Sequence, residues 1–119
     1  MDEAVYMSDR TFQLWLYTVS HGQMLLRSTK TATEKTRVDL LFKDVHAINL
    51  ISLLHGLRVT LSGPEAALDL PRGQKFYAIS NSRFQGHVIA GSFSHREDER
   101  EFHEPSPFDS LSLLKGRPL

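Results

Sequence analysis

The chain has 119 residues, with fourteen basic and fourteen acidic side chains and no cysteine. The lack of cysteine excludes disulfides, thiol nucleophiles and cysteine-ligated metals, and it fits a reducing compartment. The balanced charge provides no general field to attract nucleic acid or anionic lipid. No apolar run approaches the roughly 20 residues that span a bilayer, and the N-terminus is acidic and polar, unlike a signal peptide. We therefore expect one cytoplasmic domain without membrane contact.

Residues 1–10 are polar, and we expect them to be loosely ordered. Residues 12–28 then contain two apolar runs, interrupted by a polar triplet that ends in Gly22. Aromatic and β-branched residues favour strands, and glycine can adopt the positive φ that a tight turn needs. This segment predicts a β-hairpin.

Alternation in the first strand of this hairpin predicts two apolar faces. One face comprises Phe12, Leu14 and Leu16, and the other comprises Trp15, Tyr17 and Val19. A strand that is apolar on both faces either lies in the middle of a covered sheet or presents an aromatic surface to a partner. We favour the packing role, because Trp and Tyr pack in proteins more often than they recognise partners.

Further strands are predicted at residues 37–43, 57–61, 75–79 and 85–94. In residues 37–43, alternation places Val38, Leu40 and Phe42 inward and Arg37, Asp39 and Lys43 in solvent. Residues 45–54 fit a strand or a helix, and we favour a strand followed by an irregular link. His55 and Gly56 indicate a turn. Gly86 and Gly91 indicate a bulge or a close approach of two backbones.

Two capping patterns predict short helices. One helix would follow Ser62 and end before Pro71, and the other would follow Ser106 near the C-terminus, after a solvated charged loop at residues 95–104. The fold class is therefore mainly β: a single domain over residues 1–119, with about six antiparallel strands in a meander. The meander would form a small barrel or a two-layer sandwich, and an α+β fold is the alternative if residues 45–54 are helical.

The sequence assigns no catalytic residue, metal or cofactor. His87 and His95 are eight residues apart and could share one strand face, but no third ligand accompanies them. Neighbouring Ser and His residues on a strand point to opposite faces, so they do not form a catalytic dyad. The carboxylates that follow His95 lack the apolar pocket that would raise a catalytic pKa.

Charge is segregated along the chain. A basic segment contains Arg27, Lys30, Lys35 and Arg37, and an acidic segment contains Glu97, Glu99 and Glu101. These segments could pair within the chain or between two copies of it, or each could face a partner.

The favoured function is a small non-enzymatic protein-interaction module. It would bind another protein, or a second copy of itself, through the face of Trp15, Tyr17 and Val19 and the charged segments, and it could act by neutralising its partner. One alternative is a barrel that binds a small ligand or a metal, and that could be an enzyme, with a cavity lined by His46, Arg58, Tyr77 and His87. The other is single-stranded nucleic-acid binding, which the zero net charge disfavours.

Overall fold

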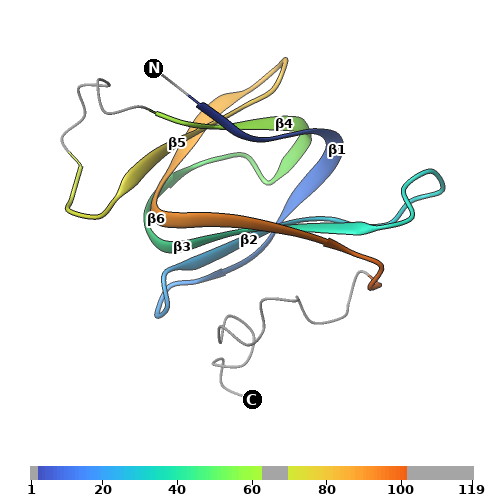
Figure 1. Ribbon diagram of the computed structural model, residues 1–119, viewed down its shortest axis with the longest axis horizontal. Coiled ribbons are helices and arrows are strands. Elements are labelled where there is room, and N and C mark those ends of the chain that lie inside the picture. The colour runs from blue at the N-terminus through green and yellow to red at the C-terminus, as the bar shows by residue number, and fades with distance from the viewer. Residues whose placement is uncertain (1–2, 63–69, 102–119) are drawn as a thin grey trace.

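A computed structural model describes residues 3–62 and 70–101 of the chain (Figure 1). Six strands form one antiparallel sheet, and the described residues contain no helix. The strands are β1 (Glu3–Thr18), β2 (Gln23–Ser28), β3 (Arg37–Asn49), β4 (Leu53–Leu61), β5 (Lys75–Ser80) and β6 (Gln85–Asp98). The prediction of a mainly β fold with about six antiparallel strands is therefore confirmed. The C-terminal helix predicted after Ser106, and residues 63–69 of the other predicted helix, lie outside the described residues.

The strand order is β1-β2-β3-β6-β5-β4, and β4 pairs with β1, so the sheet closes on itself as a barrel. The predicted meander is correct only for the two runs of sequence neighbours, β1 to β3 and β4 to β6. After β3, a link of three residues carries the chain across to β1, where Leu53 pairs with Gln13. β1 has 16 residues, which is long enough to pair with β4 through its first part and with β2 through its last.

The predicted hairpin is present, since β1 pairs with β2 on either side of a turn at residues 19–22. Its first strand begins earlier than expected, because Glu3 to Ser8 pair with Leu61 to Leu57 of β4. The expectation that residues 1–10 are loosely ordered is therefore wrong for residues 3–10. The turn predicted at His55 and Gly56 is also wrong. Gly56 lies inside β4 with φ +82°, where the pairing with β1 shifts register between Ser8 and Thr11.

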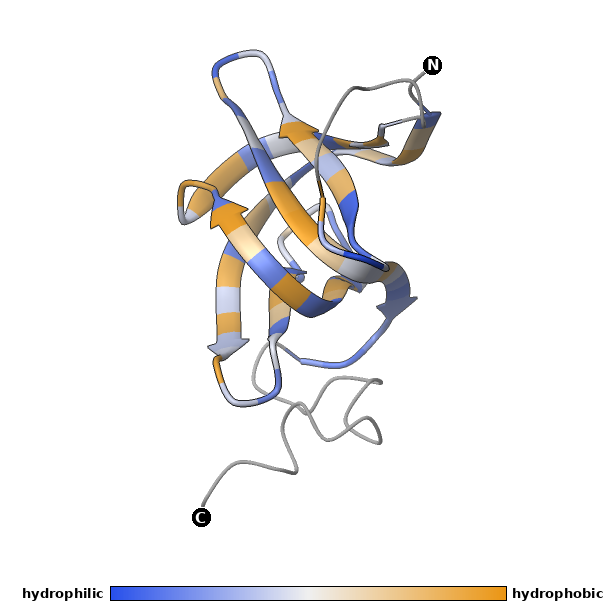
Figure 2. Ribbon diagram, turned by 90° about the vertical axis from the view of Figure 1, so that its left-hand side faces the viewer, coloured by the Kyte–Doolittle hydropathy of each residue, from blue (hydrophilic) through white to orange (hydrophobic). Residues whose placement is uncertain are grey.

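The main core is made of side chains from all six strands, and bands of high and low hydropathy alternate along these strands (Figure 2). Its buried members are Phe12, Met24, Leu26, Val38, Leu40, Phe42, Leu54, Leu57, Val59, Tyr77, Ile79, Val88 and Ala90. The inward positions predicted for Val38, Leu40 and Phe42 are confirmed.

The opposite side of β2 and β3 is buried too. Leu25 and Leu41 form a second apolar cluster there, packed against Trp15 and Leu16. A register shift between Leu14 and Leu16 explains how these two consecutive residues come to share one side of the sheet. The prediction that Trp15 and Tyr17 share a face is therefore wrong, because Tyr17 pairs with Met24, a core residue.

Two charged segments also differ from expectation. Arg37 and Asp39 are buried rather than in solvent, because they form ion pairs on the same side of the sheet as Leu25 and Leu41. The charged loop predicted at residues 95–104 begins as strand, since residues 95–98 of β6 pair with β3.

Residues 45–54 form the predicted strand followed by a link. No helix in the described part of the chain has the length and apolar character needed to cross a membrane.

Candidate functional site

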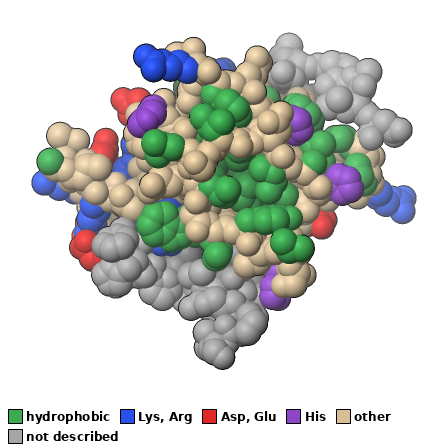
Figure 3. All heavy atoms as spheres, turned by 180° about the vertical axis from the view of Figure 1, so that it is seen from behind, with side chains coloured by type: hydrophobic (Ala, Val, Ile, Leu, Met, Phe, Trp, Pro, Cys, Tyr) green, Lys and Arg blue, Asp and Glu red, His purple; other side chains and the backbone are tan. Residues whose placement is uncertain are grey.

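Exposed large hydrophobic side chains concentrate in two neighbouring segments, residues 14–19 and 51–53. The backbone N–H of Leu14 donates to the carbonyl of Ser52 at 2.9 Å, which holds the two segments together. Tyr17 is 41% exposed and Val19 is 79% exposed. Figure 3 shows hydrophobic side chains gathered over the middle of one face of the molecule. We name as the apolar rim the residues Leu14, Tyr17, Val19, Ile51 and Leu53.

The apolar rim continues from the core. Leu14 pairs with Leu26, and Tyr17 pairs with Met24, so both lie on the core side of the sheet. They are nevertheless exposed, because β4 begins at Leu53 and does not extend beside this end of β1. Leu14 and Tyr17 would be covered if β4 continued along this end of β1. Without that cover, their side chains contact solvent.

The same end of β1 also has an open edge. Pairing with β4 ends at Gln13, apart from the hydrogen bond of Leu14, and from Trp15 to Thr18 the only described strand beside β1 is β2. An open edge presents backbone donors and acceptors that can pair with another strand. The exposed apolar side chains of the rim and the backbone edge of β1 therefore lie at the same end of the strand.

The basic and acidic segments meet within the chain. Arg27 pairs with Asp39 through two hydrogen bonds, Nε to Oδ1 at 2.8 Å and Nη2 to Oδ2 at 3.1 Å. The ring of Trp15 lies 5.1 Å from the guanidinium carbon of Arg27, within range of a cation–π interaction. Arg37 reaches Asp98 at 3.4 Å and donates to the carbonyl of Glu101 at 2.7 Å. These contacts bury the Arg27 and Arg37 side chains.

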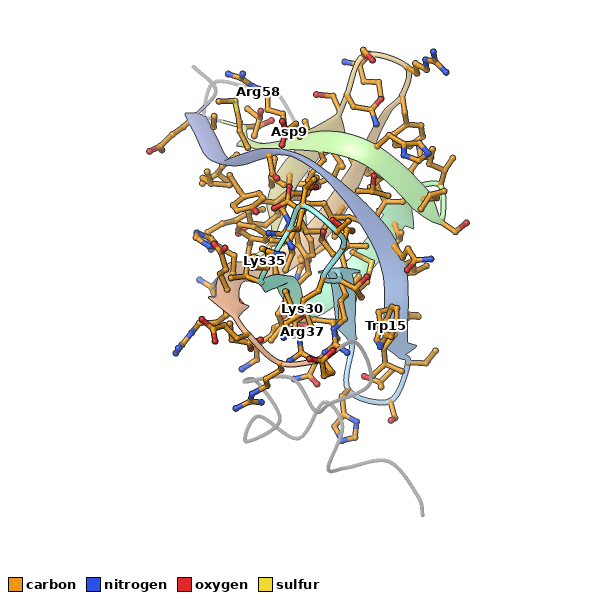
Figure 4. All side chains as sticks on the ribbon, turned by 90° about the vertical axis from the view of Figure 1, so that its right-hand side faces the viewer. Asp9, Trp15, Lys30, Lys35, Arg37 and Arg58 are labelled. Carbon is orange, nitrogen blue, oxygen red and sulfur yellow. The ribbon has the colours of Figure 1, made fainter. Side chains whose placement is uncertain are left out.

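The remaining charged residues of the predicted interaction site lie at the surface. Lys30 forms an ion pair with Glu101 at 2.9 Å, and Lys35 is exposed with its ammonium 3.4 Å from the carbonyl of Ala32. Glu97 accepts a hydrogen bond from Thr36, while Glu99 is exposed. Figure 4 shows Lys30, Lys35 and Arg37 close together, away from Arg58 and Asp9.

A polar cluster around Arg10 was not predicted from the sequence. Its guanidinium donates to the hydroxyls of Ser28 and Thr36, both at 3.0 Å, and lies 3.2 Å from a carboxylate oxygen of Glu34. Arg10 was overlooked because it lies in the segment expected to be loosely ordered. The register of the β1–β2 hairpin, in which Gln13 pairs with Arg27, brings it beside the end of β2, and the pairing of β2 with β3 brings Thr36 near.

The residues proposed to line a ligand cavity do not converge. Tyr77 is buried in the core, 5.6 Å from Phe42 between ring centroids, whereas His87 stacks on Phe76 at 4.9 Å. His46 and Arg58 are exposed. Arg58 instead borders an open hollow of about 620 Å³ between β1, β4 and the β5–β6 turn. The expected shared cavity is therefore wrong for these four side chains.

The two histidines that could share a strand face, His87 and His95, do not lie together. His95 contacts Tyr6, with ring centroids 4.9 Å apart, while His87 lies on Phe76, so the two imidazoles occupy separate environments. No group of three or more His, Asp or Glu side chains in residues 3–62 and 70–101 could hold a metal ion.

Burial raises the pKa of Tyr6, against the opposing effects of Ser8 and Arg10, and burial also raises the pKa of Tyr77.

Comparisons of this chain with protein-family models, with curated proteins and with solved structures found no match.

Proposed function

We propose that this domain is a non-enzymatic protein-interaction module whose contact surface is the apolar rim. The observation that carries the proposal is the joint exposure of Leu14, Tyr17, Val19, Ile51 and Leu53 in two hydrogen-bonded segments. Single exposed hydrophobic residues are common on soluble proteins, but a group of them gathered in one place is typical of a contact surface.

The open edge of β1 supports the same proposal. A partner strand added there would pair with backbone groups of residues 16–18 while covering the side chains beside them. Tyr17 is well suited to the centre of such a contact, because its ring buries a large area and its hydroxyl can bond to a partner. The rim contains no charged residue, so burying it incurs no cost of ion desolvation.

The two alternative functions have less support. Arg27 and Arg37 of the basic segment are buried in ion pairs, and Lys30 is bonded to Glu101, which leaves little of that segment to bind a nucleic-acid backbone. The residues suggested for a ligand cavity point to different places. The hollow beside Arg58 could admit a small molecule, but it is open to solvent.

The test compares a rim variant with a matched control. Tyr17→Glu combined with Leu53→Glu places two charges in the rim, whereas Met7→Glu places a charge at another exposed hydrophobic position, outside the rim. Partners are captured by cross-linking in the native cell extract, purified, and titrated against each variant by calorimetry. We expect the double variant to lose about 2 kcal/mol or more of binding free energy, as at interface hot spots, and Met7→Glu to bind like the natural chain.

Circular dichroism and thermal melting should show that both variants fold. If no captured partner depends on the rim, while the two variants are folded and soluble, the proposed function is wrong.

A further inference from the structure

We infer that the partner covering the apolar rim inserts an apolar side chain, flanked by a carboxylate, into a hollow beside the rim. The inference rests on the proposed function and specifies the chemistry of the partner. This rim hollow measures about 440 Å³ and is more enclosed than the hollow beside Arg58. It lies between the β3–β4 link, the start of β4 and the β5–β6 turn, and its lining includes Ile51, Leu53, His55, Asn81, Arg83 and Phe84.

Hydrogen bonds hold both sides of the rim hollow in place. On one side, a backbone hydrogen bond ties the β3–β4 link to β1. On the other side, the side-chain amide of Asn81 donates to the carbonyl of Gly56 at 3.1 Å, and its oxygen accepts from the N–H of Arg83 at 2.8 Å. The backbone N–H of Asn81 also donates to the carbonyl of Phe84 at 3.0 Å. The hollow is therefore formed in the free chain, so filling it requires little further ordering.

The apolar part of the rim hollow favours an apolar occupant. Ile51 and Leu53 belong both to the rim and to the hollow, so a partner that covers the rim also lies over the hollow. Phe84 completes this apolar lining and packs against the main core. An empty space beneath a partner would deprive these three side chains of contacts on one side. Since the strongest contacts at interfaces are made by side chains that fill such pockets, we expect an apolar or aromatic side chain here.

The charge of the rim hollow selects what accompanies that side chain. Arg83 is exposed and lines the hollow, and it forms no ion pair among the residues that the structure describes. The described lining contains no Asp or Glu. An apolar group inserted beside Arg83 would displace water from the guanidinium, and a carboxylate of the partner would replace that water with charge-assisted hydrogen bonds. An acidic group beside the apolar side chain is therefore favoured, whereas a basic group would be repelled.

Small probes test this chemistry without the partner. Phenylacetate carries an aromatic ring next to a carboxylate, and phenylacetamide is its neutral equivalent. Each probe is titrated into the isotope-labelled natural chain, and the amide resonances are followed by NMR. We expect both probes to shift the resonances of residues 51–53 and 81–84, and we expect phenylacetate to bind about threefold more tightly, as for a partly exposed ion pair.

Variants separate the apolar contact from the charge. Arg83→Gln should remove the preference for phenylacetate and leave the affinity for phenylacetamide unchanged, whereas Ile51→Ser should weaken both probes by about threefold. Arg72→Gln is the control, because Arg72 is an exposed arginine that does not line the rim hollow. Equal affinities of the natural chain for the two probes, no saturable shift with either, or shifts confined to other parts of the sheet would overturn the inference.

A partner captured through the rim separates the inference from the proposed function. Tyr17→Glu alone tests the function, since Tyr17 does not line the rim hollow. We expect Arg83→Glu to weaken binding of the partner by about tenfold and Arg72→Glu to leave it unchanged. If Tyr17→Glu abolishes binding and Arg83→Glu does not weaken it, the function stands and this inference fails. If no partner depends on Tyr17, the proposed function fails, and with it the assignment of the hollow to that partner, even where the probes bind.

Discussion

The side chains of Arg27 and Asp39 form an ion pair that is almost completely removed from solvent, with 2% and 1% of their surfaces exposed. Burial of two ions is costly, and the cost is offset here by two charge-assisted hydrogen bonds, by Arg37 beside Asp39 and by the ring of Trp15 over Arg27. Arg27 and Asp39 are direct partners in the β2–β3 register. The pair therefore favours this register over one shifted by a residue.

Removal of the Asp39 charge should strongly destabilise the domain. Asp39→Asn removes the carboxylate that bonds to the buried Arg27 guanidinium, and we expect the free energy of unfolding to fall by about 3–5 kcal/mol. Urea denaturation followed by Trp15 fluorescence measures this change. Glu101→Gln is the control, because its pair with Lys30 is largely exposed and should contribute less than about 1 kcal/mol. Equal effects of the two substitutions would show that the buried pair does not stabilise the fold.

The sequence indicates that basic and acidic segments are present, but not that some of their members are buried. Alternation in residues 37–43 places Arg37 and Asp39 opposite Val38 and Leu40, which is correct. The error lies in assuming that this opposite side faces water. Only the three-dimensional structure shows that the side is also occupied by Leu25, Leu41 and Trp15.

At the level of elements, the end of β3 and the start of β6 approach each other closely at Gly86. A Cβ atom at this position would lie 2.0 Å from the carbonyl oxygen of Asn49 and 2.6 Å from the ring of Phe84. Since real side chains cannot adopt such contacts, glycine is required for the strands to pair here. The close approach predicted from the sequence is confirmed at this glycine.

Gly86→Ala should therefore force β3 and β6 apart at this point. We expect a loss of roughly 1–3 kcal/mol, as for overpacked sites in protein cores. Thermal melting or urea denaturation provides the measurement. Gln85→Ala, a change at the exposed neighbouring residue, should alter stability by less than about 0.5 kcal/mol. A folded Gly86→Ala protein as stable as the control would contradict the role of this contact.

Local patterns were sufficient to predict several elements, including the hairpin, β5 and most of β6. They were not sufficient to predict which strands pair across the sheet. The pairing of β1 with β4 joins residues about 50 positions apart, and Glu3 to Arg10 mix charged, polar and apolar residues without a clear alternation in isolation. These residues become strand because β4 supplies their hydrogen bonds, a non-local effect that local propensity does not contain.

At the scale of the whole molecule, Arg27, Lys30 and Arg37 of the basic segment form ion pairs within the chain, whereas the apolar rim is left exposed. Tyr17 and Val19 of this rim were predicted from the two-sided apolar character of residues 12–19. Leu14 was assigned to the other face, because the register shift at Trp15 cannot be seen in the sequence. Ile51 and Leu53 were part of an ambiguous segment and could not be placed beside β1 without the strand order.

Backbone hydrogen exchange, compared between dilute free protein and protein saturated with its partner, tests the central claim most directly. We predict that the amides of residues 14–18 and 51–53 gain protection on binding, since the partner covers the rim and pairs with the β1 edge. The amides of β2, which already lie between β1 and β3, serve as the internal reference. Unchanged exchange at the rim, with new protection elsewhere on the sheet, would contradict the account.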